Sequence, residues 1–298
     1  MKKQVKRLIP IAVIAAGLWG FQACSKKSDA LPSIAGYNSS DEVASANLVA
    51  YFPFDGNSND TKGNATATAT NVTYTTGMRG QAYQGAANAY ATLTPSAAFS
   101  ALPSYSLSMW YKLSAQPTAG DPQGLFFLSG TTTQNELIYE IDTPSGTQGG
   151  TDSLKIHHGF TNLASTGYQN FTMEAYDTTK YHNFWIHVVT TYDASSSTYV
   201  IYQDGVASIN GSAFGKKTST VLLQGGDPGA APQGSLSWST DPPTQIIIGT
   251  WPAGLYGVSS TLGSNGCFKG QLDELRIFNK ALSQTEVGAL FQLGVAGR

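Results

Sequence analysis

The sequence predicts an all-β protein, built as a two-sheet antiparallel β-sandwich with one short helix at its C-terminus. Three features predict it: the composition, a series of short apolar-alternating runs, and the turn residues between them. Charged residues make up 12% of the 298 residues, and 15 tyrosines are present. Low charge with many Thr, Tyr, Val and Gly is typical of β-rich extracellular domains. The composition excludes a coiled coil, a helical bundle and an acidic disordered chain.

The predicted strands are short and regularly spaced from residue 48 onward. Gly, Pro, Asn, Asp and Ser separate them, which favours a sandwich or a barrel. The clearest runs are 48–54, 106–113, 125–128, 137–141, 154–158, 185–192, 199–203, 245–248 and 268–278. The runs 199–203 and 206–209 are joined by Asp204-Gly205, a strong signal for a two-residue hairpin.

One helix is expected, close to the C-terminus. Ser283 and Glu286 have the spacing of a capping box, and Leu282 and Val287 that of a hydrophobic staple. An apolar stripe follows, and Gly294 is placed to end the helix. We expect this helix to plug one end of the sandwich.

The N-terminus has the features of a bacterial lipoprotein signal. Four basic residues lie within residues 1–7, and the 14 residues 8–21 are apolar apart from Pro10. This stretch is short for a membrane span and is typical of a signal peptide. The sequence FQAC (21–24) resembles a lipobox, so residues 1–23 are expected to be removed and Cys24 to carry lipid. An ordinary secretory signal is the alternative.

The expected organisation is therefore a signal peptide (1–23), a flexible tether (24–46) and a single domain (47–298). With Cys24 acylated, Cys267 has no partner for a disulfide and is expected to be a buried thiol. The lipid places the protein in the bacterial cell envelope, at the outer membrane or cell surface. The net charge of −2, with no basic run outside the N-terminus, argues against nucleic acid as a partner.

Three ordered segments resemble the laminin-G-like domains of the concanavalin A-like lectin/glucanase superfamily. They are LVAYFPFDG (48–56), WIHVVTTYD (185–193) with YQDG (202–205), and GQLDELRIFNKALS (270–283). SLSMWYK (106–112) also resembles the central strand of that family. The resemblance covers about residues 47–293. It implies a jelly roll, binding of carbohydrate, and a structural calcium held by an early and a late acidic residue.

The loop at 55–60 is rich in oxygen ligands. Asp55, Asn57 and Asn59 alternate along it and Asp60 closes it, although it departs from the EF-hand pattern. In a regular strand Asp273 shares a face with Leu275, where a carboxylate needs a partner. We therefore predict a structural Ca²⁺ held by Asp55, Asn57, Asp60 and Asp273. The alternative is that residues 55–56 form a turn and that Asp273 pairs with a basic side chain.

Catalysis is the less favoured interpretation. Some members of the superfamily are retaining glucanases with a Glu-x-Asp-x-x-Glu strand, but Ser145 stands where the second Glu would follow Glu140 and Asp142. Retaining chemistry needs two carboxyl groups about 5–5.5 Å apart. The sequence does not indicate a replacement acid, although Glu174 is available. The acidic residues 136, 140 and 142 are otherwise expected on a solvated strand face or on the polar floor of a groove.

Loop aromatic residues are the candidates for stacking on sugar rings. Trp238, Trp251 and Tyr256 lie in Gly- and Pro-rich segments, whereas Trp110 and Trp185 lie in predicted strands and are expected to pack in the core. We therefore predict a non-catalytic, monomeric lipoprotein that binds a polysaccharide or another glycan. An adhesive or structural module that binds protein is the first alternative, and a glycoside hydrolase is the second.

Overall fold

The computed structural model describes residues 31–63, 65–100, 102–114, 122–133, 136–142, 154–163, 167–175, 182–207, 211–213, 216–217, 220–222, 234–254, 261–264 and 266–298. For residues 142, 154–155, 167–175, 211–213, 216–217 and 220–222 only the backbone is described. The chain divides into two compact units, Met1–Pro32 and Ser33–Arg298. All that follows concerns the second unit.

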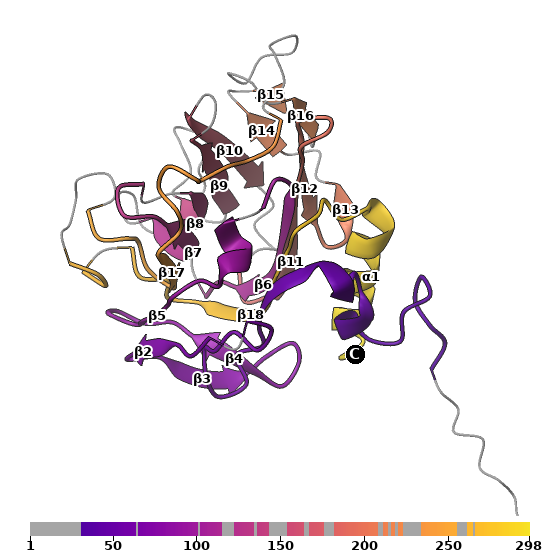
Figure 1. Ribbon diagram of the computed structural model, residues 1–298. Helices are drawn as coiled ribbons and strands as arrows, with labels where there is room; N and C mark the ends of the chain where they lie inside the picture. The colour runs from indigo at the N-terminus through magenta and orange to yellow at the C-terminus, as the bar shows by residue number, and fades with distance from the viewer. Residues whose placement is uncertain are drawn as a thin grey trace, which may run out of the picture. The chain divides into compact units, whose positions relative to one another are not determined.

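The described strands form two antiparallel sheets, as the sequence predicts. The first, here called the β6 sheet, has the order β13-β12-β11-β6-β18-β4-β3, with β1 paired to β18 and β16 to β12. Its strands are β1 (Leu48–Phe52), β3 (Thr73–Thr76), β4 (Gln81–Gln84), β6 (Tyr105–Lys112), β11 (Ile186–Asp193), β12 (Thr198–Gln203), β13 (Val206–Ala207), β16 (Thr220–Leu222) and β18 (Gln271–Phe278). Strand β18, near the end of the chain, therefore has β6 on one side and β4 and β1 on the other. Figure 1 shows β18 beside β6 and β4.

The second sheet, here called the β8 sheet, has the order β15-β14-β10-β9-β8-β7-β17-β5-β2. Its strands are β2 (Thr68–Thr70), β5 (Tyr90–Leu93), β7 (Gln123–Ser129), β8 (Leu137–Asp142), β9 (Leu154–Asn162), β10 (Gly167–Ala175), β14 (Gly211–Ala213), β15 (Lys216–Lys217) and β17 (Gln245–Ile248). Three short 3₁₀ helices (Ser40–Glu42, Ser45–Asn47, Ala97–Ser100) and helix α1 (Gln284–Val295) complete the described elements.

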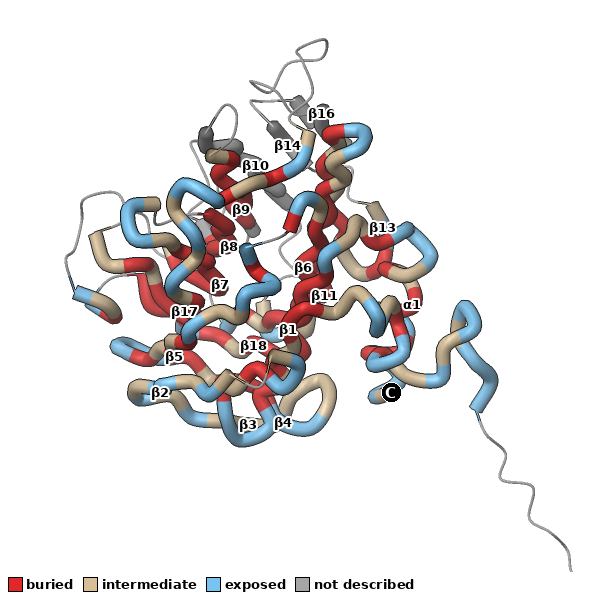
Figure 2. The backbone as a smooth tube through the Cα atoms, in the orientation of Figure 1, coloured by how far each residue is buried: buried red, intermediate tan, exposed pale blue. Residues whose placement is uncertain are grey.

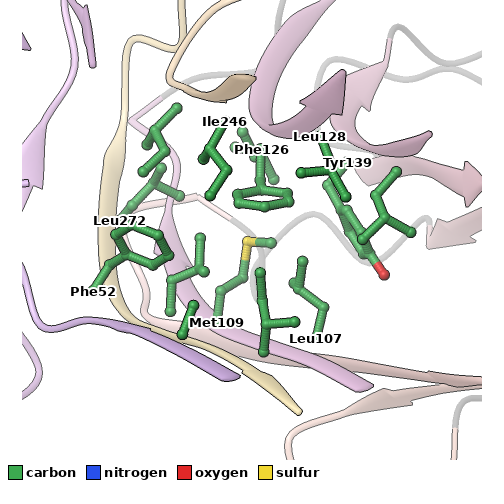
Figure 3. Close-up of a cluster of buried hydrophobic side chains, with 14 of the residues drawn as sticks. Phe52, Leu107, Met109, Phe126, Leu128, Tyr139, Ile246 and Leu272 are labelled. Atoms are coloured by element: carbon green, nitrogen blue, oxygen red, sulfur yellow. The ribbon is translucent and has the colours of Figure 1, made fainter. Parts of the chain in front are cut away.

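The main core lies between the two sheets. Alternate residues of each strand face inward, because successive side chains of a strand point to opposite faces. Figure 3 shows side chains of the β6 sheet facing those of the β8 sheet; the first set includes Phe52, Leu107, Met109 and Leu272, and the second Phe126, Leu128, Tyr139 and Ile246. Each such side chain contributes roughly 1.5–3 kcal/mol when fully buried. Figure 2 shows the buried stretches following the strands of both sheets.

The predicted hairpin and the start of the helix are confirmed. Asp204 and Gly205 both have positive φ angles, 50° and 80°, between β12 and β13, as a tight two-residue hairpin turn requires. Ser283 accepts a hydrogen bond from the Glu286 backbone, and the Glu286 carboxylate accepts one from the Ser283 backbone. This reciprocal capping box fixes where α1 begins.

The predicted place and end of the helix are wrong. α1 packs on the outer face of the β6 sheet, where Phe291 stacks on Trp110 at a centroid distance of 5.7 Å. Gly294 lies inside the helix. A glycine is needed there because a β-carbon would be 2.8 Å from the Trp110 ring. The helix runs on to Val295, and Gly297 adopts the left-handed conformation beyond it. A second apolar cluster, which includes Val189, lies under the helix.

A β-bulge in β18 corrects the predicted face of Asp273. Glu274 has a φ of 52°, and the pairing of β18 with β6 shifts register between Asp273 and Arg276. Leu272, Leu275 and Ile277 consequently all reach the main core. Asp273 is paired in register with Trp110, whose ring lies on the outer face. Asp273 therefore does not share the apolar face, as a regular strand would require.

The predicted tether is too long, because residues 33–46 belong to the folded unit. Arg79 makes two hydrogen bonds to the Asp41 carboxylate, of 2.7 and 2.6 Å, and Arg276 makes a third of 3.0 Å. The hydrogen bond from Arg79 contributes most to lowering the pKa of Asp41. Val43 is buried under α1 with 1% exposure. Within the described residues, no helix is both long and apolar enough to span a membrane.

Removal of residues 33–46 is expected to destabilise the domain, because Arg276 is buried and would lose the Asp41 carboxylate. Asp41 is exposed and Arg276 keeps Glu274 as a partner, so most of the loss comes from the buried Val43 side chain, which contributes about 1.5–3 kcal/mol. A chain starting at residue 47 should therefore melt several degrees below one starting at residue 33 in a thermal scan. Equal melting temperatures would contradict this role of the segment.

Candidate functional site

The four predicted calcium ligands separate into two pairs. Asp273 and Asp55 both hold the turn between β3 and β4. One oxygen of Asp273 accepts hydrogen bonds from the Met78 and Arg79 backbones at 2.7 and 3.1 Å. Asp55 accepts one from the Gln81 backbone at 2.7 Å. Both carboxylates therefore accept hydrogen bonds from the backbone of the same turn.

Asp60 and Asn57 do not join them. The Asp60 carboxylate accepts hydrogen bonds from the backbones of Tyr51 and Lys62 at 3.0 and 2.9 Å. The Asn57 side-chain oxygen accepts one from the Asn59 backbone at 2.9 Å. In the described part of the chain, no three His, Cys, Asp or Glu side chains come together as a metal site. The four-ligand set is therefore not assembled, and two carboxylates remain as candidates.

Asp273 is the more unusual of these two groups because it is fully buried. Burial raises its pKa to about 8, against the opposing effect of the backbone hydrogen bonds. Gly77 is required beside it, since a β-carbon there would lie 2.3 Å from the carboxylate. Any residue larger than glycine at position 77 would therefore clash with this carboxylate.

Trp238 is not available to a ligand, contrary to its prediction. It is 1% exposed, and its indole nitrogen donates a hydrogen bond of 2.5 Å to the Thr161 carbonyl. It belongs to the main core between the sheets. The Gly- and Pro-rich segment around Trp238 therefore places the indole ring in this core.

Trp251 is half-buried and packs against a small apolar cluster on the outer face of the β8 sheet. That cluster contains Phe127, Ile138 and Ile247. Tyr256 and Cys24, the remaining predicted site residues, lie outside the described residues. The predicted aromatic set is therefore not gathered on one described surface.

The acidic strand face is buried instead of solvated. Glu140 is 2% exposed and lies 2.7 Å from the His157 ring nitrogen, across the β8–β9 pair. The side chains of Asp142 and Glu174 are not described. Among the described side chains, Glu140 thus faces a histidine and not the second carboxyl that retaining chemistry needs.

A row of polar side chains crosses the outer face of the β6 sheet. Thr73 pairs in register with Gln84, Gln84 with Gln271, and Gln271 with Lys112. The next residue of β18, Leu272, pairs with inward-facing tyrosines, so the row faces outward. We call these four residues the polar row. Thr73 is exposed, and the other three are half-buried.

The amides of the polar row leave one acceptor unused. The Gln84 NH₂ group donates to the carbonyls of Gly85 and Gly270, so its oxygen must face Gln271. The Gln271 NH₂ donates to that oxygen at 2.9 Å. The Gln271 side-chain oxygen then has no hydrogen-bond partner and is buried. An acceptor buried in this way is ordinarily satisfied by an ordered water, since it is closed to a ligand at the surface.

Trp185 lies beside the Lys112 end of the row, because the next residue, Ile186, pairs in register with Tyr111. Phe184 directly precedes it. Asn183 donates a backbone hydrogen bond of 2.6 Å to the Leu113 carbonyl, which brings the next two residues against the end of β6. Phe184 is 57% exposed, and Trp185 is half-buried. Trp110, by contrast, is buried with 3% exposure under the helix. Of the two strand tryptophans predicted to pack, Trp110 is confirmed, while Trp185 keeps an accessible part.

Sequence reasoning missed this surface for a definite reason. Only Thr73 and Gln84 are close in sequence, on the two strands of one hairpin; the other residues come from three distant segments that no local pattern connects to them. Phe184 lies one residue before the predicted strand that starts at Trp185. The sequence shows an aromatic residue there but does not show that its ring is exposed.

Comparison with known proteins supports the fold. No protein-family model and no curated protein matches this chain. Among solved structures, it is similar to the botulinum neurotoxin serotype D ligand-binding domain in complex with N-acetylneuraminic acid, with a TM-score of 0.54 and 13% identity, over 83% of this chain and 50% of that one. The serotype G binding domain has a TM-score of 0.53 and 12% identity, with coverages of 83% and 51%.

The binding domain of Paraclostridial Mosquitocidal Protein 1 is similar to the same degree, with a TM-score of 0.52 and 15% identity, over 83% of this chain and 52% of that one. All three are binding domains by name. This chain spans about half the length of each. At these identities the likeness shows the β-sandwich fold and carries no ligand to this chain.

Trp238→Ala is expected to lower the free energy of unfolding by about 3–5 kcal/mol, as for other large core residues, because Trp238 is fully buried. Chemical denaturation measures this loss. Phe184→Ala, at a 57% exposed position, should change stability by no more than about 0.5 kcal/mol. Similar effects of the two substitutions would contradict the assignment of Trp238 to the core.

Proposed function

We propose that this chain is a cell-envelope lipoprotein whose β-sandwich binds a glycan and does not cleave it. The observation that carries the proposal is the polar row beside Phe184 and Trp185. Amides donate to and accept from sugar hydroxyls, and an aromatic ring offers an apolar face to the sugar ring.

The similar structures support a binding role in general terms. All are named as binding domains, and one contains N-acetylneuraminic acid. The contact between Glu140 and His157 weighs against a retaining pair of acids on β8. The glycan itself is not identified by the polar row, which contains neutral amides and one lysine.

Retention on polysaccharides tests the proposal. The mature chain with Cys24→Ser should bind at least one member of a panel of soluble and insoluble polysaccharides, without producing new reducing ends. Trp185→Ala should weaken binding by a factor of ten or more, since a central aromatic contact is worth about 2 kcal/mol. Gln271→Ala should weaken it about three- to tenfold, the value of one hydrogen bond.

Trp251→Ala is the matched control and should leave binding unchanged. Loss of binding in Trp251→Ala alone would place the ligand on the β8 sheet and contradict the proposed surface. New reducing ends would establish the hydrolase alternative, and failure on every glycan would favour a protein-binding module.

We also propose that Ca²⁺ binds at Asp55 and Asp273, where it would supply positive charge to two carboxylates held on one turn. Calcium should then raise the melting temperature of the mature chain relative to chelator, by several degrees. Asp55→Asn, at an exposed position, should reduce that rise. A rise of the same size in this variant would exclude Asp55 as a ligand.

The lipid anchor rests on the sequence FQAC at 21–24. Cys24→Ser should move the protein from the membrane fraction to the soluble fraction of the cell, because the substituted side chain cannot be acylated. Fractionation followed by immunoblotting measures the shift. Continued association with the membrane would contradict lipidation at this residue.

A further inference from the structure

Glu136 is a buried carboxyl group that the proposed function does not use. The residue directly precedes β8 and has 0% exposure. Neither of its carboxyl oxygens has a hydrogen-bond partner. An ionised carboxylate in this state is costly, so it needs either a proton or a cation.

A second carboxylate faces it across Gly130. A β-carbon built on Gly130 would lie 2.7 Å from an oxygen of Glu136 and 2.6 Å from an oxygen of Asp241. These two oxygens are therefore no more than about 5.3 Å apart. One cation with oxygen ligands at about 2.3–2.6 Å spans such a gap.

Asp241 is fixed in its position and in its charge. Its carboxylate accepts hydrogen bonds from the backbones of Thr131, Thr132 and Thr133, at 2.8, 2.9 and 2.6 Å, and from the Thr132 hydroxyl at 2.7 Å. These bonds outweigh the opposing effect of desolvation and hold its pKa below the usual value. Burial, with a smaller effect of Asp241, raises the pKa of Glu136 to about 8.

We propose that Glu136 and Asp241 form a calcium site that joins the β7–β8 loop to the segment before β17. Both oxygens of Glu136 are free, which suits the bidentate carboxylate of a Ca²⁺ site better than the strict octahedron of Mg²⁺. Asp241 is half-buried, so an ion can reach the pair from its side. Backbone oxygens and water complete the shell in a site with two carboxylates.

This site is independent of the pair at Asp55 and Asp273. Those residues hold the β3–β4 turn of the β6 sheet, whereas Glu136 and Asp241 lie at the β7–β8 loop of the β8 sheet. An experiment can separate them by removing Asp55 first. The neighbouring acid Glu140 supplies a matched control, because it lies four residues further on in β8, is also buried and has His157 as its partner.

The test compares melting temperatures at pH 8 with calcium and with chelator, in the mature chain carrying Cys24→Ser and Asp55→Asn. We expect calcium to raise the melting temperature by several degrees in this background. Adding Glu136→Gln should abolish the rise, and adding Glu140→Gln should leave it intact. Equal curves with calcium and chelator would mean that Glu136 holds a proton only, and would overturn the proposal. So would a rise that survives Glu136→Gln.

A second measurement detects the bound ion directly and leaves Glu136 in place. Tb³⁺ replaces Ca²⁺ at oxygen sites and emits when a nearby tryptophan is excited, and the Trp238 carbonyl is hydrogen-bonded to the Asp241 backbone. The Asp55→Asn chain should show tryptophan-sensitised Tb³⁺ emission that calcium competes away and that Trp238→Phe weakens. Absence of emission, or emission unaffected by Trp238→Phe, would overturn the proposal.

Discussion

The left-handed residue at Glu274 determines which side chains of β18 point in which direction. A regular strand would place Asp273 on the same face as Leu275, inside the apolar core. The single extra residue separates them, so that the aliphatic side chains face inward and Asp273 reaches the β3–β4 turn. A non-glycine residue with this φ costs about 1–2 kcal/mol.

Contacts of the Glu274 side chain offset that cost. The Tyr51 hydroxyl donates to one carboxylate oxygen at 2.7 Å, and Arg276 donates to the other at 2.6 Å. Arg276 also lies 4.2 Å from the centre of the Tyr51 ring and contacts Asp41. The bulge therefore joins three parts of the chain: β1, β18 and the segment that the sequence suggested was a tether. Bulges of this kind occur beside functional surfaces because they redirect a side chain.

The outer face of the β6 sheet is consequently divided in two. Helix α1 covers one part, where the rings of Trp110, His187 and Phe291 pack together. The polar row crosses the other part, two residues further along β6. The capping box at Ser283 fixes the helix start, and the close fit of Gly294 on Trp110 fixes its path. These local contacts place the helix over Trp110 and not over the polar row.

Features encoded in a few adjacent residues could be predicted from the sequence. Asp204-Gly205 defined a hairpin, Ser283 and Glu286 defined a helix start, and alternation defined most strands. The bulge could not be predicted, because Glu274 carries no glycine or proline signal and its partners Tyr51 and Arg276 come from two strands. Trp238 was misjudged because a flexible composition does not reveal that the segment returns to the core. The polar row could not be predicted, because its residues become neighbours only through the order of the strands in the sheet, which the sequence does not reveal.

The central claim, that a glycan binds on the polar row beside Trp185, is tested most directly by the indole N–H signals in a nitrogen–proton correlation spectrum. Residues 24–298 contain four tryptophans, at positions 110, 185, 238 and 251, and each signal can be assigned with a single Trp→Phe variant. Titration with a retained soluble glycan should shift the Trp185 signal and leave that of the buried Trp238 in place. A spectrum in which Trp251 alone shifts, or in which no signal moves, would contradict the account.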